Sequence, residues 1–153
     1  MARLSDLPPS LAHHLTEVEC PSYDTSPWAG GSPLSERRVA VVSTAGLHRR
    51  GDTPFALGAN DYRIIDGDLP SSEFVMSHIS TNFDRTGFQQ DINVVFPIDR
   101  LRELAAAKTI GSVAAFHYSF MGATAPEAFA STVRLLAPLL ERDGVNAVLL
   151  APV

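Results

Sequence analysis

Residue types that are scarce in this sequence exclude several classes of protein. Its single cysteine, Cys20, cannot form a disulfide within the chain, which fits a reducing compartment. Acidic residues outnumber basic ones, 17 to 12, and the net charge of −5 argues against nucleic acid as a partner, because phosphate binding needs a basic surface. No apolar run is long enough to span a bilayer, and the first residues lack the apolar core of a signal peptide. We therefore expect a cytoplasmic protein that binds neither nucleic acid nor membrane.

The common catalytic and metal motifs are also missing. The five histidines, at positions 13, 14, 48, 78 and 117, form no H-E-x-x-H pattern and pair with no second cysteine, so we expect no metal site. Neither a G-x-S-x-G elbow nor a P-loop is present. Acidic neighbours of Cys20, Glu17 and Glu19, disfavour the thiolate that a cysteine nucleophile needs.

Composition along the chain predicts two parts. Residues 1–37 are rich in proline and glycine, which break any long periodicity. We expect an extended, proline-rich lead-in there, with one short helix over 9–18 and with Trp28 or Tyr23 anchoring it. Residues 38–153 are expected to form one α/β domain, the N-terminal part of a longer protein.

Short apolar runs with β-branched residues predict the strands. Residues 38–44 (RVAVVST) have the continuous pattern of a strand buried on both faces. The other expected strands are 61–65, 74–78 and a buried last strand over 146–153, while 112–117 fits either a short strand or an extended loop. Residues 79–91 are polar and aperiodic, and we expect a loop.

Two helices are expected between the later strands. Pro97 suits the first position of one helix, whose apolar face is Ile98, Leu101, Leu104 and Ala105. Residues 124–127 (TAPE) resemble a capping box that opens a second helix. Its expected apolar face is Phe129, Val133, Leu136 and Leu140, with Pro138 inside the helix and Gly144 as its C-terminal cap.

The alternation of strands and helices predicts a Rossmann- or flavodoxin-like fold. In this α/β class a mostly parallel sheet carries flanking helices, and here the last strand lies at the C-terminus. Ligands of such sheets bind beyond the carboxyl ends of the strands. Two segments at such ends each allow two interpretations. Residues 43–46 (STAG) form a weak phosphate loop or a tight turn, and 117–122 (HYSFMG) form a pocket wall or a buried His and Tyr satisfied by the backbone.

Three segments resemble the selenoprotein B family of the glycine, sarcosine, betaine and D-proline reductases. They are VSTAGLHRRGDTPF (42–55), SHISTNFDRTGFQQDINVVFPIDRLRELA (77–105) and IGSVAAFHYSFMGAT (110–124). The resemblance covers about residues 36–153. It implies an oxidoreductase in which a selenolate attacks the α-carbon of an amine-bearing substrate on a pyruvoyl partner subunit and the C–N bond is cleaved.

In this family the last strand runs through a Thr/Ala-Pro-Val stem into a redox motif, Cys or selenocysteine-x-x-Cys. The sequence has the stem, Ala151-Pro152-Val153, and lacks the motif. The resemblance therefore implies an N-terminal fragment cut at a UGA codon and inactive alone. No cofactor is expected in this chain, and selenocysteine is expected immediately after Val153 in the full-length protein.

The resemblance also implies site residues and partners. The candidate catalytic residues are His117, His78 and Tyr118, and the candidate substrate-binding residues are His48, Asp84, Asp91, Asn93 and Ser119. We expect His117 close to Val153, because consecutive parallel strands tend to be neighbours. Expected partners are a small-molecule substrate, a partner reductase subunit or a thiol reductant, and a second copy in a homodimer. The alternative function is a non-catalytic, flavodoxin-like module for small-molecule binding or interaction.

Overall fold

The computed structural model describes residues 3–18, 22, 24–26, 28–80 and 85–153. Contacts divide the chain into two units, Met1–Gly30 and Gly31–Val153. The first unit contains a 3-10 turn, η1 (Leu4–Asp6), and the helix α1 (Pro9–Glu17). Trp28 is 89% exposed, Tyr23 lies outside the described residues, and the anchoring role expected for one of them stays a prediction.

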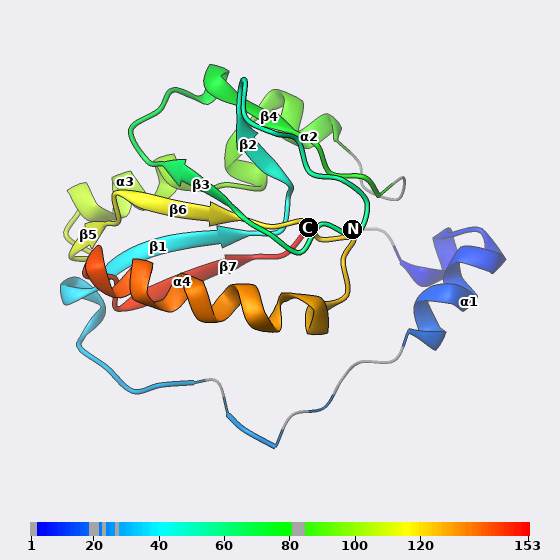
Figure 1. Cartoon of the computed structure of the whole chain (residues 1–153), viewed down its shortest axis with the longest axis horizontal. Helices are drawn as coiled ribbons and strands as arrows, with labels where there is room; N and C mark the ends of the chain where they lie inside the picture. Colours follow the sequence, from blue (N-terminus) through cyan, green and yellow to red (C-terminus); the bar gives the residue numbers. More distant parts are fainter. Residues whose placement is uncertain (1–2, 19–21, 23, 27, 81–84) are drawn as a thin grey trace. The chain divides into compact units, whose positions relative to one another are not determined.

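The main sheet of the second unit is mostly parallel, as the sequence predicts (Figure 1). Its strands are β3 (Arg63–Asp66), β6 (Phe116–Ser119), β1 (Arg38–Ser43), β5 (Ser112–Val113) and β7 (Ala147–Ala151). β1 pairs in parallel with β5 and β6 and also with β7, and β3 runs antiparallel to β6. The α/β fold class is thereby confirmed.

The order of the strands differs from the expectation that the last two strands, β6 and β7, are neighbours. β6 and β7 both pair with β1 and not with each other, because the connection between them passes over β1. β7 has β1 as its one partner in the described sheet, and its side chains are also poorly covered. Val148 is 42%, Leu149 39% and Leu150 69% exposed, which corrects the expectation of a buried strand.

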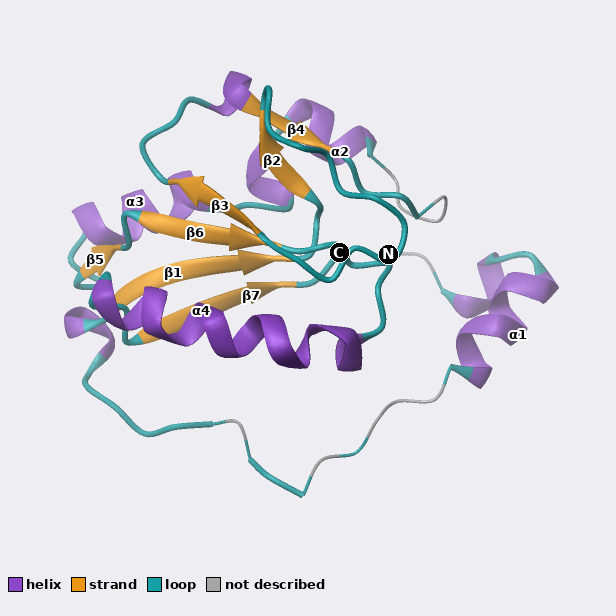
Figure 2. Ribbon diagram, in the orientation of Figure 1, coloured by secondary structure: helices purple, strands orange, loops and turns teal. Residues whose placement is uncertain are grey.

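Helices and a small second sheet flank the main sheet (Figure 2). The remaining helices are α2 (Thr86–Gln90), α3 (Ile98–Ala106) and α4 (Ala130–Arg142), with short 3-10 turns η2 (Leu34–Glu36), η3 (Ser71–Glu73), η4 (Ile92–Val94) and η5 (Pro126–Phe129). The second sheet pairs β2 (Leu47–Arg49) with β4 (Phe74–Met76). α2 lies in the segment expected to be a loop, because five residues are too few to show a periodicity.

Side chains of the main sheet enter two cores, one on each face. On one face, Leu136 of α4 packs with Tyr118 and Phe120. On the other, Val41 and Phe96 belong to a larger cluster that includes α3 and the second sheet. Alternation along β6 therefore sends neighbouring side chains into different cores.

The last helix begins and ends differently from the sequence pattern in two details. Thr124 does not cap it, since its hydroxyl donates to the Ala59 carbonyl at 2.8 Å and the helix opens through η5. Val133 is 47% exposed, and Leu139 takes its place against the core. Gly144 has φ +66° after the last turn, which confirms the glycine cap.

Candidate functional site at the carboxyl ends of the strands

The carboxyl ends of β1, β6 and β7 meet beside Val153 (Figure 1). The segments that follow β1 and β6 are joined by backbone hydrogen bonds: Phe120 N–H donates to Ser43 O, and Gly122 N–H to Thr44 O, both at 2.8 Å. An isolated bridge between Ala45 and Met121 continues this pairing. The parallel strand ends thus form one continuous surface, the usual position of a ligand site in such a sheet.

The turn after β1 uses its backbone donors internally. Four consecutive amides, from residue 44 to residue 47, all donate within the protein. Their acceptors are Ala151 O for Thr44 (3.1 Å), Ser43 Oγ for Ala45 (3.2 Å), Phe120 O for Gly46 (2.8 Å) and Ser119 Oγ for Leu47 (2.8 Å). No N–H of this turn is left to hold a phosphate, so the tight-turn interpretation fits. Ser119, a candidate substrate-binding residue, here accepts a backbone N–H.

The backbone of Val153 is held at the centre of this surface. Its N–H donates to Thr44 Oγ1 at 2.8 Å, and the same hydroxyl donates to Val153 O at 3.3 Å. A Cβ added to Gly122 would lie 2.5 Å from Val153 O, 2.9 Å from Thr44 O and 3.0 Å from His78 Nε2. Only glycine permits that approach.

His78, a candidate catalytic residue, lies at this surface beside Gly122. It is 3% exposed, Arg85 donates to its carbonyl, and its Nδ1 accepts the Ser80 N–H at 3.2 Å. Burial lowers the pKa of His78 and the charge of Arg85 lowers it further, while the nearby Val153 backbone opposes the shift. The ring is therefore neutral near pH 7, with its proton on Nε2.

His117 lies in the interior of the sheet and not at the strand ends. Three steps along β1, from Val39 to Val42, lie opposite five steps from Val113 to Tyr118, so the partner strand bulges by two residues. The Nδ1 of His117 accepts the Val41 N–H at 2.9 Å, in place of a backbone carbonyl that the bulge displaces. The expected proximity of His117 to Val153 is therefore wrong.

The environment of His117 keeps its ring uncharged. The side chain is fully buried, and its ring meets Phe96 edge-on, with centroids 5.3 Å apart. Burial lowers the pKa of His117 to about 4. Because Nδ1 is an acceptor, protonation would break the bond to Val41, so this imidazole acts as a structural acceptor.

Tyr118 points to the opposite face of the sheet from His117 and cannot act on the same substrate atom. It contacts Tyr62 edge-on, with ring centroids 5.8 Å apart, and burial raises the pKa of its hydroxyl. Tyr118 lines a pocket of about 310 Å³ whose other walls are Ile64, Phe116, Leu139, Arg142 and Asp143.

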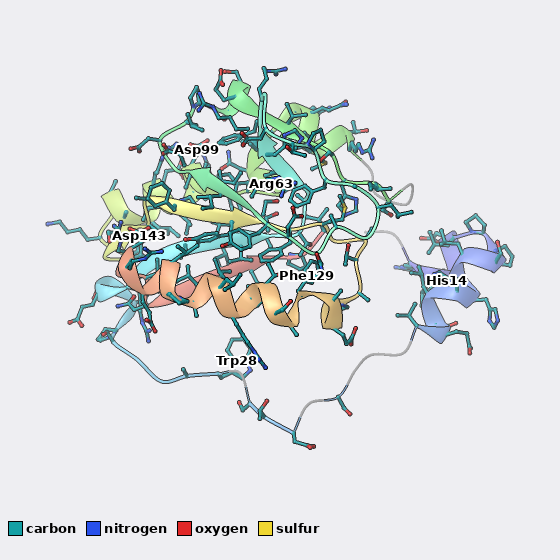
Figure 3. The ribbon with its side chains drawn as sticks, in the orientation of Figure 1. His14, Trp28, Arg63, Asp99, Phe129 and Asp143 are labelled. Atoms are coloured by element: carbon teal, nitrogen blue, oxygen red, sulfur yellow. The ribbon has the colours of Figure 1, made fainter. Side chains whose placement is uncertain are left out.

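Asp143 has a structural role that sequence reasoning missed. Figure 3 places it at the opposite end of the last helix from Phe129. Its carboxylate accepts the N–H groups of Ala115 and Phe116, at 2.8 and 3.0 Å, and pairs with the Arg38 guanidinium at 2.5 Å. Burial raises the pKa of Asp143, but the Arg38 and backbone hydrogen bonds outweigh it and leave the pKa lowered. Asp143 thus holds the bulge open.

Two other candidates, Asp91 and Asn93, stabilise a helix start. Asp91 Oδ1 accepts the Asn93 N–H at 2.9 Å, which lowers the pKa of Asp91. Asn93 Oδ1 accepts the Asp99 N–H, and its amide donates to Asp99 Oδ2, both at 3.0 Å. These bonds stabilise the start of α3.

Of the last two candidates, His48 belongs to the second sheet and Asp84 lies outside the described residues. His48 is buried opposite Val75, and its Nδ1 lies 3.0 Å from Arg49 O, so Nδ1 carries the proton. Among the residues that are described, no group of three His, Cys, Asp or Glu side chains could hold a metal ion.

Comparison with known proteins identifies the family. The family model for glycine/sarcosine/betaine reductase selenoprotein B matches residues 11–153. The chain belongs to this selenoprotein B family. No described helix is long and apolar enough to cross a membrane. No solved structure matches the chain.

Two relatives show how much of a longer protein this chain covers. It is 35% identical over 120 residues to the D-proline reductase subunit gamma of Acetoanaerobium sticklandii, covering 76% of this chain and 49% of that protein. It is 29% identical over 143 residues to the glycine reductase complex component B subunit gamma of Carboxydothermus hydrogenoformans, covering 88% and 32%. The chain thus spans half or less of the length of these relatives.

Proposed function

We propose that this chain is the N-terminal part of a selenoprotein B-type reductase that performs reductive C–N cleavage or related thiol and selenol redox chemistry. The observation that carries the proposal is the gathering of three strand ends, Thr44, Gly122 and His78 around the Val153 backbone. In this proposal the redox motif comes directly after Val153, and residues 1–153 alone are inactive.

The site supports a role for His78 in particular. A selenocysteine or cysteine directly after Val153 would supply the nucleophile, since its ionised form is reactive near neutral pH. His78 is neutral and carries its proton on Nε2, next to Val153 and Gly122. Its Nε2–H is placed to donate a hydrogen bond to an anion at this edge.

The same geometry limits the roles of the other candidates. His117 is neutral and engaged with Val41 N–H, and Tyr118 lies on the other face, so we assign neither to the chemical step. The partners in the proposal are a small amine-bearing substrate and a second reductase subunit or a thiol reductant, which restores the reduced motif.

Reading the coding sequence beyond Val153 tests the proposal at once. We expect an in-frame UGA codon, then a Cys codon at the fourth position of the motif, and enough further sequence to match the length of the relatives. A UAA or UAG codon with no coding potential downstream would exclude the proposed reductase.

A further inference from the structure

We propose that Thr44, Gly122 and His78 form a clamp on the Val153 backbone that fixes where the next residue of the chain lies. The inference rests on the proposed function, in which that next residue is the redox nucleophile. Thr44 and Gly122 are positioning residues, since they act on the nucleophile through the backbone that carries it.

Thr44 extends the ladder between β1 and β7 beyond the end of β1. Its backbone N–H donates to Ala151 O at 3.1 Å, the last regular bond of the pair. Its hydroxyl then accepts the Val153 N–H at 2.8 Å and donates to Val153 O at 3.3 Å. One side chain thus holds both polar groups of one residue. Pro152, between the two, has no N–H to engage.

Gly122 allows this backbone to come close. Its N–H donates to Thr44 O at 2.8 Å, so its position is fixed relative to Thr44. A methyl group at this Cα would lie 2.5 Å from Val153 O, a separation that backbone atoms cannot accept. Any larger residue at position 122 must therefore push Val153 outward.

His78 closes the clamp from a separate element. Its ring is buried, and its Nε2 lies 3.0 Å from the point where a Cβ on Gly122 would also meet Val153 O. Ser80 N–H and the Arg85 side chain hold its other polar atoms. Because Nδ1 accepts from Ser80, the proton is on Nε2, the ring nitrogen that lies beside Gly122 and Val153. The histidine cannot turn to another partner without breaking the Ser80 bond.

Planarity of the peptide bond makes the clamp effective for the next residue. The Cα and carbonyl oxygen of one residue lie in one plane with the next amide nitrogen and the next Cα. Holding the Val153 carbonyl therefore fixes the plane of the following peptide and the position of the following Cα, ~3.8 Å away. A nucleophile needs such fixed placement, because an error of about 1 Å can cost on the order of a hundredfold in rate.

Amide hydrogen exchange of the 153-residue chain tests the clamp without any activity. Thr44→Val keeps the shape and removes the hydroxyl, and Thr44→Ser restores it. We expect Thr44→Val to speed exchange of the Val153 amide about tenfold, as for the loss of one hydrogen bond, and Thr44→Ser to remain near the wild-type rate. The matched control is Thr124→Val, which removes a hydroxyl bond of the same length to Ala59. Equal exchange rates at Val153 in wild type and Thr44→Val would overturn the clamp.

Kinetics of the full-length protein test whether the clamp positions the nucleophile for reaction. Thr44→Val and Gly122→Ala should each lower kcat by about tenfold or more while KM stays within about twofold, because position and not substrate binding is lost. Thr44→Ser should recover kcat, and Thr124→Val should leave it unchanged. A full-length protein without redox activity contradicts the proposed function, whereas the exchange rates still decide the clamp. An active Thr44→Val enzyme with wild-type kcat contradicts the positioning role.

Discussion

His117 couples the stability of the sheet to pH. Its pKa falls from 6.5 to about 4 in the folded protein because burial disfavours the charged ring. The unfolded chain therefore binds more protons between these two values, and stability is lost as the pH falls through this window. A shift of this size corresponds to about 3 kcal/mol between pH 7 and pH 4.

Replacing His117 by asparagine separates the contribution of His117 to the pH dependence of stability from that of the other titratable groups. An amide oxygen can still accept the Val41 N–H but does not titrate, so we expect the fall in unfolding free energy between pH 7 and pH 4 to shrink by about 2–3 kcal/mol. Urea denaturation at several pH values measures it. His14→Asn, at an exposed position of the first unit, is the control and should keep the wild-type slope. A His117→Asn slope equal to wild type would show that the ring charges freely.

The Asp143 carboxylate stabilises the bulge through three hydrogen bonds. Asp143→Ala leaves two backbone N–H groups and the Arg38 guanidinium without their acceptor. We expect a loss of about 1–3 kcal/mol in unfolding free energy at neutral pH, because the two backbone N–H groups lose their acceptor and a half-buried ion pair is broken. Chemical denaturation beside Glu141→Ala, which removes a nearby exposed acid, measures the difference. Similar losses in the two variants would contradict this role of Asp143.

Among the secondary-structure elements, β7 is an edge strand without the usual protection. It contains no charge and no proline over Ala147–Ala151, and its apolar side chains are 39–69% exposed at positions 148–150. Natural edge strands normally carry a charge or a covering segment. In the 153-residue chain this strand is the surface that we expect to pair with a second copy.

Leu150→Lys tests that expectation. A charge on the outer edge should abolish self-association while costing little stability, because Leu150 is 69% exposed. Sedimentation velocity over a range of protein concentrations measures the effect. Leu135→Lys, at a residue of α4 that is 67% exposed, serves as the control and should leave association unchanged. A wild-type chain that stays monomeric up to high micromolar concentration would refute the prediction.

The elements that the sequence predicted well are those with a local signal. β1 has a continuous apolar run, and the start of α3 and the end of α4 are marked by Pro97 and Gly144. α2 and η5 have too few residues for a periodicity. The exposure of β7 and its pairing with β1 depend on the order of strands, which no local pattern encodes.

The sequence predicted the location of the candidate site better than the residues that form it. The strand ends follow from the fold class, and His78 was a candidate from the family resemblance. Thr44 and Gly122 gain their roles from contacts with Val153, which is 109 residues from Thr44 in sequence. The one local signal for Gly122 was a glycine shortly after a predicted strand. His117 was a catalytic candidate, and the structure buries it in a bulge stabilised by Asp143. No local pattern in the sequence indicates that bulge.

For the molecule as a whole, the proposed reductase activity depends on the residues that come after Val153. The chain spans 49% and 32% of two relatives, and the strand ends gather where the family's redox motif would begin. The positions of Thr44, Gly122 and His78 matter for catalysis only if a nucleophile follows Val153 in the chain.

Peptide mapping by mass spectrometry of the protein from its native host, grown with selenium and alkylated with iodoacetamide at mildly acidic pH, tests this dependence most directly. At such a pH a selenol is ionised and reacts, while ordinary thiols, with pKa about 8.5, do not. We expect a peptide that continues from Ala151-Pro152-Val153 into an alkylated residue with the selenium isotope pattern. A peptide that ends at Val153, or continues without selenocysteine or cysteine, would contradict the proposed reductase.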